Sequence, residues 1–446
     1  MTTRHVLVGT GIAAISAAEA IRRADPRVAI TMIGPEAHHW YSRPGLAYLL
    51  TGEVPAERLA IRTPAEVERL GATRLEARVM RIEPTNRWVV LDGGERVSYD
   101  RLLIATGASS IAPEFPGAAL RGVVRLDAWD DARQLLALAR PGRVAVVAGG
   151  GSTALELVEG LHARGVATHY FMRGTRYWSR ILDPVESAMV EARLMAEGVE
   201  LHRHTAIRAV TGGASGGVGG VNTEDGRHLP CDIVAVAVGI RPNIALARDA
   251  GIAVDRGILT SEFMETSAPD VYAAGDAAQV HDPVTRRSEL DTLWASAQAQ
   301  GTMAGMNMAG QRVPHRRRPA INVTRLAGIT VTIVGRIGED GGDPDLLTLT
   351  RGQSERWAPG DGGEGRWTIG GARAGDRLRV VVSDRAIVGA LVMGDQSLSR
   401  PLAHLIGEEV DISALRPALD ASPDRAMDIL LDFCARHVSD RAAAHR

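Results

Sequence analysis

The chain of 446 residues contains no lysine and only two cysteines, Cys231 and Cys434. Without lysine, neither a Schiff base nor an ammonium group beside a cofactor is possible, since all 51 basic side chains are arginine. The two cysteines stand far apart and form no C-x-x-C pair, which argues against a dithiol active site and an iron–sulfur cluster. We therefore expect no disulfide framework and no metal site.

The sequence also lacks a strong charge of one sign and a long apolar run. Its formal net charge is only −2, so no basic excess indicates nucleic acid as a partner. No apolar run reaches the roughly 20 residues that a membrane-spanning helix needs. The first motif begins at residue 9, which leaves no room for a signal peptide, and we expect a cytoplasmic protein. A chain of this length predicts two or three domains.

Two glycine-rich motifs are present, G-T-G-I-A-A at residues 9–14 and G-G-G-S-T-A at residues 149–154. Each follows a short apolar run and opens a helical pattern. Small residues let the backbone approach a pyrophosphate closely, and the helix N-terminus supplies free N–H groups and partial positive charge. In the first motif Gly9, Gly11 and Ala14 hold the three required positions. Two such motifs predict two bound dinucleotides, which usually means redox chemistry between them.

An acidic residue that binds the ribose is expected about 20 residues after each motif, at the end of the next strand. Glu36 fits this position after the first motif, whereas Arg173 stands there after the second and Arg176 follows it. Guanidinium groups can pair with a 2′-phosphate, each charge-assisted hydrogen bond being worth roughly 1.5–3 kcal/mol. This pattern favours NADPH over NADH. The alternative is that these arginines merely line a solvated loop of an arginine-rich protein.

Six motifs occur along the chain in a fixed order. They are GxGxxA at 9–14, Tyr41-Ser42-Arg43-Pro44, Ala105-Thr106-Gly107-Ala108, GGGxxALE at 149–156, Ala237-Val238-Gly239-Ile240-Arg241-Pro242-Asn243 and Tyr272-Ala273-Ala274-Gly275-Asp276. This combination resembles the FAD-dependent pyridine-nucleotide oxidoreductases. Within them it is most similar to the branch of rubredoxin and ferredoxin reductases and the flavoprotein portion of NAD(P)H nitrite reductases. The similarity covers about residues 4–310 and, more weakly, the tail.

The resemblance implies an α/β fold with two Rossmann-like, doubly wound domains of the glutathione-reductase type. Alternating β-branched stretches from Ile321 onward, followed by short helical patterns from Leu398, predict a C-terminal α+β domain. The FAD-binding domain would be discontinuous, comprising residues 1–112 and 241–320. The NAD(P)-binding domain would comprise residues 113–240. Residues 321–446 would form the C-terminal domain, which serves dimerisation or partner docking and contains a disordered-looking segment at 358–365.

The resemblance also implies a set of FAD-binding residues. The turn at 9–14 would hold the pyrophosphate, Glu36 the adenosine ribose, and Arg43, followed by Pro44, would reach the pyrophosphate as well. The chain would pass close to FAD at Thr106, Gly107 and Gly275, and Asp276 would accept a hydrogen bond from the ribityl chain or its phosphate side. A helix that begins near Leu293 and Trp294 would stabilise negative charge on the reduced flavin.

The nicotinamide nucleotide would be held by the second motif and by residues that follow it, namely Gly149, Gly151, Ser152, Thr153 and Gly239. Glu156 stands where relatives keep a glutamate near the nicotinamide, although a glutamate in the first turn of a helix needs no function. Several relatives pair that glutamate with a lysine, and here the lysine position is Tyr48. Tyr48 would stack, donate a hydrogen bond or simply pack. No cysteine occurs between residues 41 and 52, which excludes a disulfide reductase and a cysteine-sulfenate peroxidase.

The expected function is therefore that of a flavoprotein oxidoreductase, which passes hydride from NAD(P)H to FAD and electrons to an external acceptor. A ferredoxin- or rubredoxin-like carrier or a partner subunit is the first choice of acceptor, and oxygen or nitrite-linked machinery is the alternative. A second hypothesis is a flavin-containing redox sensor or assembly subunit with slow turnover, which the Tyr48 departure motivates. A third is a non-redox domain pair that binds one nucleotide. The resemblance also implies a homodimer.

Overall fold

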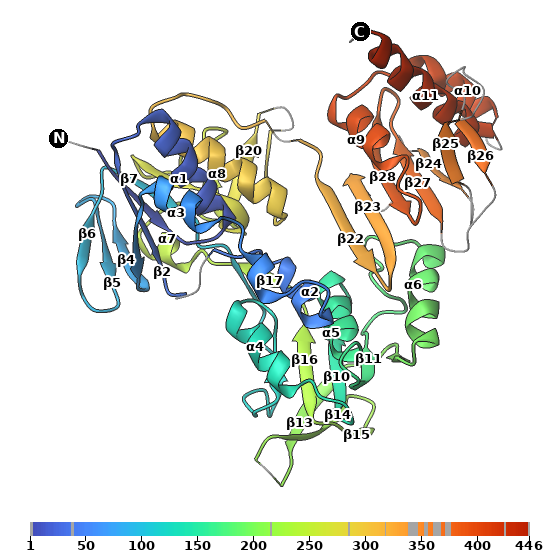
Figure 1. Ribbon diagram of the computed structural model, residues 1–446, viewed down its shortest axis with the longest axis horizontal. Helices are drawn as coiled ribbons and strands as arrows, with labels where there is room; N and C mark the ends of the chain where they lie inside the picture. The colour runs from blue at the N-terminus through green and yellow to red at the C-terminus, as the bar shows by residue number, and fades with distance from the viewer. Residues whose placement is uncertain are drawn as a thin grey trace. The chain divides into compact units, whose positions relative to one another are not determined.

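A computed structural model describes residues 3–36, 40–214, 216–283, 286–316, 318–337, 347–351, 356–359, 367–370, 376–422 and 425–444. The chain forms two compact units, one of residues 1–170 and 206–317, the other of residues 171–205 and 318–446. Of the segment 358–365, Ala358 belongs to a short strand, and residues 360–365 lie outside the described residues. The helices and strands are labelled in Figure 1.

The first unit contains a parallel five-stranded sheet whose strand β1 leads into the first glycine motif. Its order is β19-β7-β1-β2-β3, and Val6 pairs with Thr31 on one side and with Leu102 on the other. The central strands bury the unbroken apolar runs Val6–Val8 and Leu102–Ile104, as a parallel sheet covered on both faces requires. The strands are β1 (Arg4–Val8), β2 (Ala29–Gly34), β3 (Thr73–Glu76), β7 (Arg101–Ile104) and β19 (Val271–Ala273).

Helices α1 (Ile12–Ala24) and α8 (Trp294–Met308) pack against each other at very short range. A Cβ atom on Gly301 would lie 2.1 Å from the carbonyl oxygen of Ala13, and one on Gly305 would lie 2.4 Å from that of Ala17. Only residues without a side chain permit this approach. Small residues on both helices therefore bring the N-terminal motif and the distant helix α8 into one core.

A second sheet surrounds the second glycine motif, and its strands in the first unit have the order β11-β10-β16-β9. Within the first unit, β16 pairs in parallel with both β10 and β9. The strands are β9 (Val123–Val124), β10 (Val144–Gly149), β11 (Ala167–Phe171) and β16 (Ile233–Ala237), and β12 (Glu200–His202) belongs to the second unit. Helix α5 (Ser152–His162) follows β10 directly, so that the strand–turn–helix order of the first motif is repeated.

The remaining elements of the first unit are short. Its other helices are α2 (Gly45–Thr51), η1 (Ala56–Leu59), α3 (Pro64–Leu70), α4 (Trp129–Leu138), α7 (Ala245–Asp249) and η2 (Gly275–Ala277). Its small sheets consist of β4 (Val79–Glu83), β5 (Trp88–Leu91), β6 (Arg96–Ser98), β8 (Ala108–Ser110), β13 (Ile207–Gly212), β14 (Val218–Thr223), β15 (His228–Pro230), β17 (Ile240–Pro242), β18 (Ile258–Thr260), β20 (Ala278–Asp282) and β21 (Arg287–Leu290).

The second unit has an antiparallel sheet in the order β22-β23-β28-β27-β24. Its strands are β22 (Ile321–Leu326), β23 (Ile329–Gly335), β24 (Leu347–Arg351), β27 (Arg377–Val382) and β28 (Ile387–Met393), and β25 (Arg356–Pro359) pairs with β26 (Trp367–Gly370). Its helices are α6 (Pro184–Ala196), α9 (Ser399–Gly407), η3 (Ser413–Leu415), α10 (Arg416–Ala421) and α11 (Ala426–Ala444). Among the described helices of the chain, none has the length and apolarity needed to cross a membrane.

Candidate functional site

The first glycine motif forms a tight turn between β1 and α1. Gly9 has a φ of 130°, and a Cβ atom there would lie 2.1 Å from the carbonyl oxygen of Ala105. Gly11 is the N-cap of α1, makes no side-chain cap, and a Cβ atom on it would meet nothing within 4 Å. Ala14 is fully buried. The N-terminus of α1 therefore faces open space with uncapped N–H groups, which is the geometry that a pyrophosphate fits.

The carboxylate of Glu36, shortly after β2, is held by two donors. The hydroxyl of Tyr41 donates to Glu36 Oε2 at 2.7 Å, and Arg43 donates to Oε1. Arg43 also donates to the carbonyl oxygen of Asp127 at 2.6 Å, and the backbone N–H of Trp129 donates to the Tyr41 hydroxyl at 3.0 Å. The acid and the arginine that the sequence singled out are thus brought together, and Tyr41 fixes them both.

A second polar group lies after β19. The N–H of Gly275, whose φ is 77°, donates to Oε1 of the buried Gln300 at 2.9 Å. Burial raises the pKa of the next residue, Asp276, while the charge of Arg43 acts in the opposite direction and that of Asp291 adds to the rise. The arginine and this carboxyl group therefore belong to one electrostatic neighbourhood. Helix α8 begins just beyond, with Leu293 as N-cap and Trp294 as its first residue.

The turn at Thr106 and Gly107 is tied to Asn243. The Thr106 hydroxyl donates to the carbonyl oxygen of Asn243 at 2.8 Å. In return, the side-chain amide of Asn243 donates to the carbonyl oxygen of Thr106 at 3.0 Å. The Asn243 N–H also donates to the carbonyl oxygen of Gly107, where φ is 67°. These reciprocal bonds fix the position of the turn. Asn243, Tyr41 and Asp127 were absent from the predicted site, although Asn243 and Tyr41 belong to the motifs that were quoted.

The second glycine motif repeats the geometry of the first. A Cβ atom on Gly149 would lie 2.3 Å from the carbonyl oxygen of Ala237, so the turn presses against the end of β16. Gly151 is the N-cap of α5 without a side-chain cap, and a Cβ atom on it would meet nothing within 4 Å. Ser152 and Thr153 are the first residues of this helix. A second open helix N-terminus, suited to a second pyrophosphate, thus lies in the same unit.

An apolar surface follows β16 beside Gly239, whose φ is 121°. Val238 and Ile240, on either side of it, are 37% and 47% exposed, which is unusual for large apolar residues next to a buried strand. Exposed apolar side chains at a strand end provide a surface on which a flat ring can pack.

Helix α2, which begins after its N-cap Pro44 and contains Tyr48, packs against α5. A Cβ atom on Gly160 would lie 2.7 Å from Leu50 Cβ, and Arg164 donates to the carbonyl oxygen of Leu50 at 2.8 Å. Within the first unit, this contact joins the segment that follows the first glycine motif to the helix that follows the second. Glu156 lies on α5, one turn before Gly160, and burial raises its pKa to about 7. No charged group of the described residues contributes to that shift.

Replacing Glu156 with glutamine is expected to stabilise the protein at pH 8. The pKa is about 7 in the folded protein against 4.5 for the ordinary group, so ionisation opposes folding and stability falls as pH rises from about 4.5 to 7. Glutamine removes this penalty, which approaches about 3 kcal/mol above pH 7. Urea unfolding of both proteins in excess FAD measures the unfolding free energy that Glu156→Gln gains over the wild type. This gain should be about 2 kcal/mol larger at pH 8 than at pH 5.

The matched control for this prediction is Glu57→Gln, which removes the same charge from an exposed position. Its unfolding free energy should stay within about 0.5 kcal/mol of the wild type at both pH values. A gain in unfolding free energy of Glu156→Gln that does not change with pH would contradict the desolvated, weakly acidic state of Glu156.

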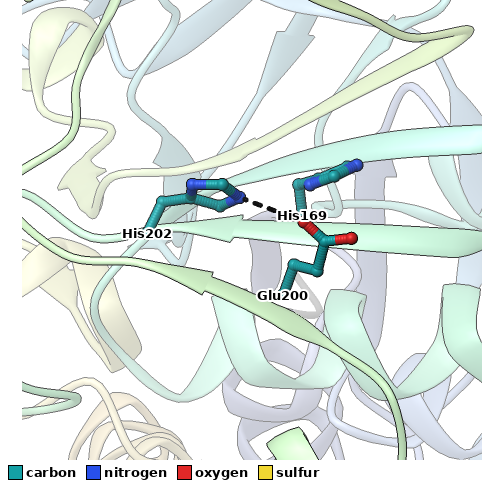
Figure 2. A group of neighbouring side chains, drawn as sticks. All are labelled: His169, Glu200 and His202. Carbon is teal, nitrogen blue, oxygen red and sulfur yellow. Dashed lines mark ion pairs between the residues drawn. The ribbon is translucent and has the colours of Figure 1, made fainter.

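The segment after β11 belongs to the second unit. Arg173 is exposed, and Arg176 is half-buried and donates to the carbonyl oxygen of Ser179 at 3.3 Å. Figure 2 shows the side chains of His169 on β11 and of Glu200 and His202 on β12. Glu200 Oε2 and His202 Nε2 are 3.9 Å apart, and the carboxylate is 68% exposed. Solvent therefore screens this pair, and it contributes little to stability.

Neither cysteine has the properties of a reactive thiol. Cys231 and Cys434 are both free and buried. Burial raises the pKa of each thiol to about 12, whereas a nucleophilic cysteine needs a lowered pKa and access to solvent. Electron transfer through these two side chains is therefore not supported.

Comparison with known proteins adds independent evidence. The model of the family described as pyridine nucleotide-disulphide oxidoreductase matches residues 3–301. The chain is 31% identical over 330 residues to the ferredoxin–NAD(+) reductase component of the biphenyl dioxygenase system of Paraburkholderia xenovorans (strain LB400), covering 74% of this chain and 80% of that protein. It is 28% identical over 340 residues to the assimilatory nitrate reductase electron transfer subunit of Bacillus subtilis (strain 168), covering 76% of this chain but only 43% of that protein.

Among solved structures, the chain is similar to one chain of the covalent putidaredoxin reductase–putidaredoxin complex. The TM-score is 0.81 with 22% identity, and the alignment covers 96% of this chain and 98% of that one. At this identity the likeness concerns the fold. Together with the two parallel sheets, it confirms the predicted α/β class.

Proposed function

Because the chain belongs to the pyridine nucleotide-disulphide oxidoreductase family, we propose that it carries electrons from NAD(P)H through FAD to an external redox protein. The observation that carries this proposal is the pair of open helix N-termini, at Gly11 and Gly151, within one compact unit. FAD, when bound, supplies the chemistry, since it accepts two electrons with a proton from the nicotinamide and gives the electrons up one at a time.

We propose that the first open helix N-terminus binds FAD. The N–H groups behind Gly11 would receive the pyrophosphate, and Glu36 would accept hydrogen bonds from the adenosine ribose. Arg43 is placed by Glu36 and Asp127 and would donate to a phosphate oxygen. Asp276 would accept a hydrogen bond from the ribityl side, and the N-terminus of α8 would favour negative charge on the flavin edge. The shared neighbourhood of Arg43 and Asp276 supports this assignment.

The second open helix N-terminus would bind the nicotinamide nucleotide. Its pyrophosphate would lie above Gly151, Ser152 and Thr153, and the nicotinamide would pack near Gly239. Glu156 would then orient the carboxamide by a hydrogen bond. A carboxyl group with a pKa of about 7 is partly protonated at neutral pH, so it can donate as well as accept, whereas an ordinary ionised glutamate only accepts. Tyr48, on the helix that packs against α5, takes the place of the lysine in the relatives.

We propose that NADPH is preferred over NADH, with Arg173 and Arg176 binding the 2′-phosphate. Replacing both with alanine is expected to raise the KM for NADPH by about 100-fold, since two charge-assisted contacts are lost. The KM for NADH should change by less than about twofold. Steady-state kinetics with each nucleotide measures this, and Arg180→Ala, an exposed arginine of the same segment, is the control. An equal rise for both nucleotides would refute the proposed contact.

The electron acceptor is proposed to be a ferredoxin-type carrier, because two buried thiols leave no dithiol relay on the chain. Under anaerobic conditions NADPH oxidation should accelerate on addition of a small iron–sulfur protein. In air without that carrier, NADPH oxidation should be slow. Fast oxygen consumption without a carrier would instead identify an oxidase. A flavin-containing redox sensor is the second candidate, since Glu156 has no lysine partner, and it would turn over slowly with every acceptor.

We also propose a cytoplasmic homodimer. The cytoplasm holds the NAD(P)H pool that the reaction consumes. The outermost strand of the C-terminal sheet, β22, exposes Ile321 and Val323 by 45% and 61%, and covering such side chains favours association. Light scattering of the purified chain measures its mass, and a monomer at micromolar concentration would refute the dimer.

A further inference from the structure

Arg379 and Arg377 extend from strand β27 of the C-terminal sheet toward the first turn of helix α6, within the second unit. Arg379 binds the carboxylate of Glu186 through two hydrogen bonds of 3.0 Å and also donates to the carbonyl oxygen of Ile181. Glu186 is fully buried and Arg379 is 6% exposed. A planar guanidinium bound at two points fixes both the distance and the angle between the elements that carry it.

The carboxylates of Asp183 and Glu186 cap helix α6. Asp183 is the N-cap and accepts from the N–H of Glu186 at 2.8 Å, while Glu186 accepts from the N–H of Asp183 at 2.8 Å. Arg377 lies 2.5 Å from Asp183 Oδ2. Each carboxylate therefore binds the helix backbone and a guanidinium of β27 at once. The start of α6 is set by the C-terminal sheet.

Helix α6 in turn holds the segment that carries Arg173 and Arg176. The N–H of the buried Tyr177 donates to Glu191 Oε1 at 2.6 Å, and its carbonyl oxygen accepts from the Ser187 hydroxyl at 2.7 Å. Glu191 and Ser187 both lie on α6. Arg176 directly precedes Tyr177, so its backbone position follows that of the helix.

We infer that Arg379 is a positioning residue for nucleotide selectivity, acting through Glu186 and helix α6 on the segment 173–177. This inference rests on the proposed function and deepens it, because it makes the C-terminal domain a determinant of which nucleotide binds. Glu186 and Arg379 form a buried ion pair, with the partly buried Asp183 and Arg377 beside it, and apolar residues of the same volume usually stabilise at least as well as such a pair. What the paired charges provide is one defined placement of the segment.

The test replaces the buried pair with apolar residues of similar length, Arg379→Met together with Glu186→Met. The double substitution leaves no unpaired buried charge, so this variant is expected to fold where Arg379→Met alone risks unfolding. We expect the KM for NADPH to rise about tenfold, because small displacements of positioned groups are costly. The KM for NADH, kcat and FAD content should stay within about twofold of the wild type.

The single variant Arg379→Lys keeps the charge but not the two-point geometry, and it should give an intermediate rise in the KM for NADPH. Arg385→Met is the matched control, since Arg385 lies in the same unit, is 82% exposed and pairs with Asp411 at 3.6 Å. It should leave the ratio of the two KM values unchanged.

Three outcomes would overturn the inference, and they differ in what else they refute. A folded double variant that keeps the wild-type ratio, while Arg176→Ala loses it, would refute the role of Arg379 alone. If both variants keep the wild-type ratio of the KM for NADPH to the KM for NADH, the segment 173–177 does not discriminate between the two nucleotides. Failure of the wild type to reduce its flavin with either nucleotide would refute the proposed function, and the inference with it.

Discussion

Replacing Gly11 with valine is expected to give a folded but colourless protein. A Cβ atom at this position meets nothing within 4 Å, and the φ of Gly11, −80°, is open to residues other than glycine, so we expect the protein to accommodate the larger side chain. It would, however, occupy the space between the N-terminus of α1 and the pyrophosphate. We expect FAD affinity to fall by at least about 100-fold, equivalent to about 2.7 kcal/mol.

The measurements for this prediction are the flavin absorbance of the purified protein and its thermal unfolding without FAD. Gly93→Val is the matched control, because a Cβ atom on Gly93 also meets nothing within 4 Å and this residue lies in a surface turn of the same unit. The control should remain yellow. A Gly11→Val protein with wild-type FAD content would show that this turn does not hold the cofactor.

Replacing Gly151 with valine is expected to give the complementary result, a yellow protein that NAD(P)H does not reduce. Gly151 is likewise an N-cap with open space around it and a φ of −118°. Valine should therefore leave the fold and the first site intact while blocking the second. The rate of flavin reduction by NADPH at a fixed concentration should fall by at least about 100-fold.

Chemical reduction supplies the control for the Gly151 variant. Dithionite needs no nucleotide site, so it should bleach the flavin of the variant as completely as that of the wild type. Loss of the flavin itself, or reduction by NADPH at the wild-type rate, would contradict the division of roles between the two glycine motifs.

The sequence was sufficient to predict the two strand–turn–helix units because each depends on local contacts. The conformation at Gly9 and the open N-cap at Gly11 follow from residues that stand side by side in the chain. Helix α1 begins at Ile12, within the motif that the sequence predicts to open a helix, and the class of the C-terminal sheet follows from alternating β-branched residues. These features require no knowledge of distant segments.

Features that depend on distant segments could not be predicted in the same way. The pKa of Glu156 is raised by burial alone, and burial depends on the packing of α2 against α5. The bond from Arg43 to Asp127 and the pairing of Arg379 with Glu186 join residues far apart in the sequence. In an arginine-rich chain, no local pattern distinguishes these arginines from solvated ones. The roles proposed for the site residues and the three domain boundaries stay predictions.

Anaerobic mixing of the purified wild-type protein with NADPH or NADH in a stopped-flow instrument tests the central claim most directly. The account predicts that the protein is isolated with bound FAD and that its flavin absorbance bleaches within about a second, faster with NADPH at low nucleotide concentration. A colourless protein, or a yellow one whose flavin stays oxidised for minutes with both nucleotides, would contradict it.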